Sequence, residues 1–185
     1  MNKDGSLKIT LSHIEGGHSE GIAPQSKELL SRNLFKSFDK INAGDDIPKF
    51  SLAGKIFPCK CIRVYDGDTI HVAIKYNGIM TDFTIRMYGY NSAELRTKNK
   101  EEKAKGNEAK EYISGLILGK NILVKFVDND KYGNRWLAYI YTIEPVKSNN
   151  STDNVHLTIG DCVNTMMVKN GYGVEYFGKG EKKWT

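Results

Sequence analysis

Two aspartates beside a glycine are the first residues in this sequence that could do chemistry. Asp66 and Asp68 flank Gly67 between two apolar runs, and Asp-Gly is a favoured dipeptide of tight β-hairpins. Such a turn explains Asp66 and Gly67, but it does not require the carboxylate of Asp68. Carboxylate oxygens are ligands of hard cations such as Ca²⁺, so Asp68 is either an ordinary turn residue or part of a metal site.

A second group of polar residues lies at the end of another apolar run. Arg86 alternates with Ile85 and Met87, which places it on the opposite face of a strand. Asn91 and Glu94 follow just beyond that strand. An arginine in a strand is often solvated, but its guanidinium group also suits bidentate binding of phosphate.

A third group, residues 130–135, reads Asp-Lys-Tyr-Gly-Asn-Arg and is typical of a hairpin turn, yet it ends in a second arginine, Arg135. Together the three groups supply a carboxylate and an amide for a metal ion, another carboxylate as a base, and two guanidinium groups. Metal and guanidinium groups stabilise charge on phosphate oxygens, and a carboxylate can activate water. The combination indicates phosphodiester hydrolysis.

Alternating apolar residues predict the strands that would position these groups. The runs cover residues 57–65, 69–76 and 79–89, and turn dipeptides separate them. Asp66-Gly67 and Asn77-Gly78 both suit the positive φ values of tight hairpins. We therefore expect a three-stranded meander.

Helical spacing follows the meander, from the charged stretch that begins at Lys98 to a stop at Gly119. Residues 122–127 and 136–143 are rich in β-branched and aromatic side chains and predict two more strands. A polar insertion at 145–154 and a short helix at about 161–170 complete the pattern. The order predicts an α+β, mainly β fold, namely a five-stranded OB-fold barrel of Greek-key topology with two or three helices.

The first part of the chain differs from the rest. We expect residues 1–52 to form a partly disordered N-terminal arm, 53–180 the barrel domain, and 181–185 a tail. Apolar residues between Lys27 and Ile41 recur at helical spacing and predict a short amphipathic helix. That helix would pack on the domain, decorate a flexible arm or bind a partner.

The net charge of +5 is unevenly distributed. The first 50 residues carry seven basic and seven acidic side chains, whereas the remainder carries 20 and 15. A mildly basic domain is compatible with a polyanionic partner, although charge alone does not distinguish nucleic acid binding from an ordinary lysine-rich surface.

The expected lack of targeting signals and of cysteine motifs argues against several classes of protein. The sequence has no apolar run near the roughly 18 residues of a membrane span, and its opening lacks the apolar core of a signal peptide. Three cysteines without a C-x-x-C pattern support neither a disulfide framework nor a zinc ribbon. We expect an intracellular monomer, in cytoplasm or nucleus, that is not secreted and binds no membrane.

Between residues 56 and 178 the motifs, in order, resemble the staphylococcal nuclease (thermonuclease-like) family. The resemblance rests on Tyr65-Asp-Gly-Asp-Thr69, Ile85-Arg-Met-Tyr-Gly-Tyr-Asn-Ser-Ala-Glu94, Asp130-Lys-Tyr-Gly133, Arg135-Trp-Leu-Ala-Tyr-Ile-Tyr141, and Val163-Asn164 before Gly171. It implies an OB-fold nuclease that uses Ca²⁺, with Mg²⁺ or Mn²⁺ as alternatives. The substrate would be DNA and/or RNA, cleaved with little sequence specificity to leave 3′-phosphate ends.

The same resemblance implies roles for individual residues. Asp68 matches the principal metal carboxylate, Ser92 lends a backbone carbonyl to the metal, and Asp66 is an outer-shell carboxylate. Arg86 and Arg135 match phosphate-binding arginines, and Glu94 matches the general base. Substrate contacts fall on Lys131, Tyr132 and Tyr176.

Three departures from the family pattern affect these expectations. Asn91 replaces a second metal carboxylate, which predicts weaker metal binding through its amide oxygen. Ala93 replaces a proline before Glu94 and would loosen that loop, and Asn134 lengthens the turn before Arg135. A catalytically silent module that binds nucleic acid or protein is therefore the alternative to a nuclease.

The C-terminal segment from Gly171 onward resembles family members from large DNA viruses. A viral origin would place the protein inside a host cell.

Overall fold

The computed structural model describes residues 36–130, 135–145 and 157–178, and the chain separates into the units Met1–Lys49 and Phe50–Thr185. The predicted boundaries at residues 52 and 180 stay predictions. Most of the predicted helix between residues 27 and 41, and the tail 181–185, lie outside the described residues. The described end of that helix, residues 36–41, forms a turn in which the Ile41 N–H donates to the Phe38 carbonyl at 2.9 Å.

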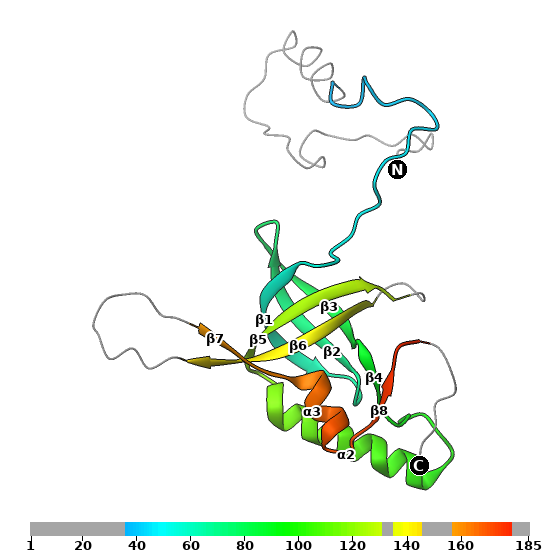
Figure 1. Cartoon of the computed structure of the whole chain (residues 1–185), viewed down its shortest axis with the longest axis vertical. Helices are drawn as coiled ribbons and strands as arrows, with labels where there is room; N and C mark the ends of the chain where they lie inside the picture. Colours follow the sequence, from blue (N-terminus) through cyan, green and yellow to red (C-terminus); the bar gives the residue numbers. More distant parts are fainter. Residues whose placement is uncertain (1–35, 131–134, 146–156, 179–185) are drawn as a thin grey trace, which may run out of the picture. The chain divides into compact units, whose positions relative to one another are not determined.

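A closed barrel of five strands forms the second unit (Figure 1). The strands are β1 (Ile56–Val64), β2 (Thr69–Tyr76), β3 (Ile79–Met87), β5 (Asn121–Asn129) and β6 (Trp136–Pro145). Their order is β3-β2-β1-β5-β6 with antiparallel neighbours, and a parallel β3–β6 pairing closes the barrel. The expected mainly β, five-stranded fold is confirmed.

The β2–β3 hairpin turns where the sequence places Asn77 and Gly78. Asn77 has φ 47° and Gly78 φ 83°, the left-handed conformation that a two-residue hairpin of this kind requires. Tyr76 and Ile79 pair across the turn. The register of this hairpin then sends Ile85 and Met87 inward and leaves Arg86 on the other face.

The barrel interior and the faces of two helices form one hydrophobic core. Cys59 and Cys61 belong to this core, and burial raises the pKa of the Cys59 thiol to about 12 and that of Cys61 to about 11. Both cysteines are therefore neutral packing residues. The fully buried side chains also include Ile70, Val72, Ile74, Ile85, Met87, Val124, Phe126 and Ile140.

Two helices, α2 (Lys100–Ile117) and α3 (Val163–Lys169), lie together at one end of the barrel in Figure 1. The Asn99 side chain accepts hydrogen bonds from the first-turn N–H groups of α2 and so caps its start. Gly119 and Gly171 follow the two helices with φ of 73° and 76°, as the predicted helix ends require. Neither described helix combines the length and the apolar character needed to cross a membrane.

Three short strands were not predicted. β7 (Leu157–Cys162) pairs with β6 after the polar insertion, and β4 (Gly89–Asn91) pairs with β8 (Val174–Tyr176). The three-residue strands β4 and β8 are too short to show a period in the sequence. The predicted third strand also ends early, at Met87, because Gly89 at the start of β4 adopts φ 72°.

A buried asparagine joins α3 to two parts of the barrel. The Nδ2 of Asn164 donates to the carbonyls of Tyr88 at 2.8 Å and Ala138 at 3.1 Å, and its Oδ1 accepts from the Ile140 N–H at 3.0 Å. Three backbone groups thus bond to one side chain, although the Ala138 carbonyl also accepts the Tyr88 N–H at 2.9 Å. Because Tyr88 lies between β3 and β4, the Asn164 side chain also fixes the segment that follows Arg86.

Replacing Asn164 with Ala should lower the free energy of unfolding by about 3 kcal/mol, because buried backbone groups would lose their partners. Urea denaturation measures the change. Asn170→Ala is the matched control, since this exposed asparagine near the end of α3 makes one side-chain hydrogen bond, to the Tyr112 hydroxyl. Equal losses in the two variants would contradict the assignment.

Candidate active site

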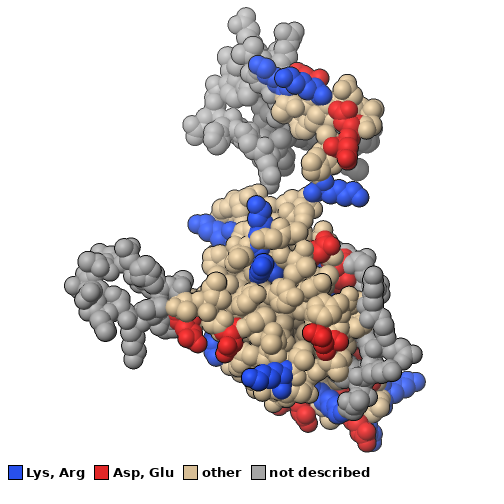
Figure 2. All heavy atoms as spheres, viewed as in Figure 1, with Lys and Arg blue, Asp and Glu red and all other residues tan. Residues whose placement is uncertain are grey.

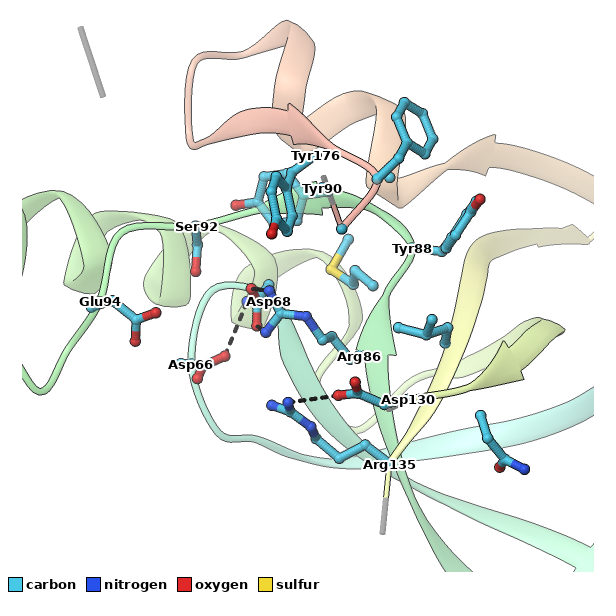
Figure 3. A pocket seen from close by; sticks show the side chains of 16 residues that line it. Asp66, Asp68, Arg86, Tyr88, Tyr90, Ser92, Glu94, Asp130, Arg135 and Tyr176 are labelled. Atoms are coloured by element: carbon cyan, nitrogen blue, oxygen red, sulfur yellow. Dashed lines mark hydrogen bonds and ion pairs between the residues drawn. The ribbon is translucent and has the colours of Figure 1, made fainter. Parts of the chain in front are cut away.

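A pocket of about 430 Å³ opens where the β1–β2 turn, the β3–β4 segment, the start of β6 and β8 meet (Figure 3). Seven of the ten predicted site residues line it: Asp66, Asp68, Arg86, Ser92, Glu94, Arg135 and Tyr176. Asn91 is fully buried beside the pocket. Lys131 and Tyr132 lie outside the described residues. The structure thus gathers into one place residues that are separated by more than a hundred positions in the chain.

The centre of the pocket is a paired carboxylate and guanidinium group. Arg86 Nη2 lies 2.9 Å from Asp68 Oδ2, and Nη1 donates to Asp68 Oδ1 at 3.2 Å. The Thr69 hydroxyl also donates to Oδ1, at 2.8 Å. Asp68 is only 4% exposed, so Arg86 provides most of the charge compensation that a buried carboxylate needs.

That compensation is incomplete. Burial raises the pKa of Asp68 to about 6, the Arg86 charge opposes the rise, and the nearby Asp66 carboxylate adds to it. Two carboxylates in one turn repel each other. The Oδ1 of Asp66 also accepts the Asp68 N–H at 3.1 Å, which holds the two acidic residues in this arrangement.

Asn91 supports the arginine rather than lining the pocket. Its Oδ1 accepts from Arg86 Nη2 at 2.7 Å, and its Nδ2 donates to the Ser92 carbonyl at 3.1 Å. Both oxygens that the family pattern would offer to a metal, the Asn91 Oδ1 and the Ser92 carbonyl, therefore have protein partners here.

Gly67 is required for close packing and not for the positive φ that the sequence suggests. It is not among the glycines with positive φ, so the turn does not need its conformational freedom. A Cβ at this position would lie 2.6 Å from Ser92 Cβ and 2.8 Å from Ala109 Cβ. Glycine is required because the turn that carries Asp66 and Asp68 packs directly against the Ser92 segment and α2.

The second arginine has a partner that sequence reasoning missed. Arg135 Nη2 lies 2.6 Å from Oδ2 of Asp130, whose side chain is 7% exposed. The Asp130 N–H donates to the Arg135 carbonyl at 2.9 Å, so backbone as well as side chains join these two residues. Figure 3 shows the two arginines entering the pocket, each beside its own aspartate. Asp130, the acidic first residue of the 130–135 motif, was the sequence signal that could have indicated this ion pair.

Aromatic side chains form another part of the wall. Tyr88, Tyr90, Tyr176 and Phe177 all line the pocket, and the Tyr88 ring packs edge-on against Phe177 with centroids 5.5 Å apart. Sequence reasoning proposed Tyr176 but not Tyr88 or Phe177. Phe177 approaches through tertiary contact with Gly89, where an added Cβ would lie 2.9 Å from its ring.

Charge in the pocket differs from charge on the whole domain. Among the described lining residues, four are acidic, Asp66, Asp68, Glu94 and Asp130, whereas two are basic, Arg86 and Arg135. Figure 2 shows basic and acidic side chains interspersed over the visible face, without a continuous basic stripe. The positive excess of the domain is therefore not concentrated in the described wall of the pocket.

Together, a closed five-stranded barrel and a pocket with paired arginines and carboxylates define a nuclease-like class of protein. A family model described as "Staphylococcal nuclease homologue" matches residues 84–184. The chain belongs to this family, as its motifs predict. The viral origin suggested by the C-terminal segment stays a prediction.

One relative is the probable endonuclease LCL3 of Yarrowia lipolytica (strain CLIB 122 / E 150). It is 26% identical over 161 residues, an alignment that covers 77% of this chain and 66% of the relative. The chain thus spans just under two thirds of that protein's length.

Replacing Arg86 with Ala should leave Asp68 buried without its cation and destabilise the domain by about 3 kcal/mol at pH 8. The Asp68 pKa already lies above the ordinary aspartate value of 3.8, so the stability that this group contributes is present below pH 4 and lost as pH rises through about 6. Loss of Arg86 raises that pKa further, and the variant's deficit should shrink near pH 4.5.

Urea denaturation in EDTA at the two pH values measures this deficit. Arg63→Ala is the control, because Arg63 is an exposed arginine of β1 that contacts His71 instead of a buried carboxylate. A deficit for Arg86→Ala that does not depend on pH would contradict the assigned pairing.

Proposed function

We propose that this protein is a metal-dependent phosphodiesterase that hydrolyses DNA and/or RNA with little sequence specificity and leaves 3′-phosphate ends. The observation that carries the proposal is the convergence of Arg86, Arg135, Glu94 and the Asp66–Asp68 turn on one pocket. Family membership and the similarity to a probable endonuclease support the same chemistry. Intracellular location and a monomeric state stay predictions.

A divalent cation suits the charge of this pocket. Phosphodiester substrates are anionic, and the described lining residues carry more acidic than basic groups, so substrate binding there requires added positive charge. The donors are oxygen atoms of the Asp68 and Asp66 carboxylates and of the Ser92 carbonyl, which can accept a second bond besides that from Asn91. Oxygen donors fit Ca²⁺ or, as alternatives, Mg²⁺ or Mn²⁺.

The pocket offers the type of donor atom that these cations prefer, but few side chains that could serve as ligands. The described residues contain no group of three or more His, Cys, Asp or Glu side chains placed to hold a metal. Backbone and water oxygens would complete the coordination. With Asn91 in place of a carboxylate, we expect weak binding. When bound, the cation would supply a Lewis acid beside the scissile phosphate.

The two arginines would hold the phosphate. Each guanidinium group is now paired with an aspartate, Arg86 with Asp68 and Arg135 with Asp130, and each retains N–H groups that can donate to phosphate oxygens. Their fixed positions would stabilise the charge that develops on those oxygens during hydrolysis. Glu94, which lines the pocket on the loop after Ser92, would accept a proton from the attacking water.

Relaxed sequence specificity agrees with the aromatic wall. Tyr88, Tyr176 and Phe177 offer ring surfaces to a base, and stacking on aromatic rings tolerates any base because every base has a π-face.

A silent binding module is the second candidate. It is favoured by Asn91, whose amide oxygen binds Arg86 instead of pointing into the pocket. Such a module would bind nucleic acid through the same arginines without hydrolysis.

Glu94→Gln should lower kcat by at least about a hundredfold, because the amide cannot accept the proton from water. The assay is digestion of single-stranded DNA and RNA with millimolar Ca²⁺, Mg²⁺ or Mn²⁺, and EDTA should abolish cleavage. Glu175→Gln is the control, since Glu175 is an exposed carboxylate of β8 that does not line the pocket. Absence of cleavage by the wild-type protein with all three metals would leave only the silent module.

Asn91→Asp should increase Ca²⁺ affinity by restoring a carboxylate next to Asp68 and Arg86. Isothermal titration calorimetry of both proteins gives the two dissociation constants. Equal constants would exclude residue 91 from the metal site.

A further inference from the structure

We propose that Gly106 of α2 is a positioning residue for Glu94. The contact between this glycine and the Ala93 carbonyl sets where the Glu94 carboxylate stands in the pocket. The inference rests on the proposed function, because it assigns Glu94 the role of base.

The contact is close and involves backbone. Gly106 is buried within α2, and a Cβ built on it would lie 2.8 Å from the Ala93 carbonyl oxygen and 2.9 Å from Leu95 Cδ2. Ala93 is 2% exposed. The residues on both sides of Glu94 therefore pack against the helix at a position where the helix has no side chain.

Helix propensity does not explain this glycine. Glycine is among the least favourable residues in a helix interior, and Gly106 is not among the glycines with positive φ. α2 contains a second glycine, Gly115, where an added Cβ would meet nothing within 4 Å. Of the two, only Gly106 provides room for another segment of the chain.

The contact replaces a restraint that the family pattern would supply in another way. The sequence suggests a looser loop because Ala93 stands where a proline is usual. In the structure the Ala93 carbonyl instead rests on α2. Beyond Glu94, the Arg96 guanidinium lies 5.7 Å from the centroid of the Tyr65 ring, at the start of the turn that bears Asp66 and Asp68. Glu94 thus lies between Ala93, which packs on α2, and Arg96, which contacts Tyr65.

A methyl group at position 106 would push the Ala93 carbonyl away by several tenths of an ångström. The displacement would pass directly to Glu94, the next residue. A base acts only when it is correctly placed against its water, so a small shift lowers kcat. Arg86 on β3 and Arg135 just before β6 lie outside the segment from Ala93 to Leu95, so KM should change less than kcat.

The test compares Gly106→Ala with Gly115→Ala, the same substitution in the same helix. We expect Gly106→Ala to lower kcat about tenfold with KM within twofold. Gly115→Ala should leave both constants unchanged and raise the melting temperature. In ¹⁵N-HSQC spectra, the Ala93 and Glu94 amide signals should move in Gly106→Ala and remain in place in Gly115→Ala.

Each result separates the two proposals. If the wild-type protein cleaves and Gly106→Ala cleaves equally well, the positioning role is overturned while the nuclease stands. If the wild-type protein does not cleave, the amide signals still test the contact, and unmoved signals overturn it. If Gly106→Ala unfolds even in the Gly115→Ala background, Gly106 is a residue of general packing and the proposal fails.

Discussion

The pairing of Asp68 with Arg86 is the interaction on which the rest of the site depends. A carboxylate that is almost entirely buried costs free energy unless a cation accompanies it. Here the cation is Arg86 of β3, which pairs with Thr69, the residue that follows Asp68. Asn91 then binds the same guanidinium group and the Ser92 carbonyl. One charge pair thereby links the β1–β2 turn, β3 and β4, and determines which side chains face the pocket.

Close approach of backbone segments is the second constraint. Gly67, Gly89 and Gly106 each stand where a Cβ would collide with a neighbouring segment. These three contacts bring the Asp66–Asp68 turn, the wall at Phe177 and the Glu94 loop toward one another. The polar groups of the pocket therefore rest on closely packed segments, which hold these groups around one cavity.

Much of this arrangement follows from the sequence, and the parts that do not have a physical reason. Alternation of apolar residues and the Asn77-Gly78 turn predict β2 and β3 and place Arg86 on the opposite face to the core. The motifs shared with the family predict that Asp68, Glu94 and Arg135 belong to the site. Asp130 was missed because its pairing with Arg135 is a side-chain contact that spacing in the sequence does not specify. Phe177 was missed because only tertiary contact with Gly89 brings it to the pocket, and β4 and β8 are too short to have a period.

The parallel pairing that closes the barrel passes through the site itself, since Arg86 of β3 lies opposite Leu137 of β6. Before this closure, Arg86 and Arg135 belong to separate pieces of chain, and Asn164, far along the sequence, is still needed to hold both pieces. A chain under synthesis thus carries Arg86, the first arginine of the site, for some eighty residues before Asn164 follows. The complete site would therefore form only after the chain has been synthesised as far as α3.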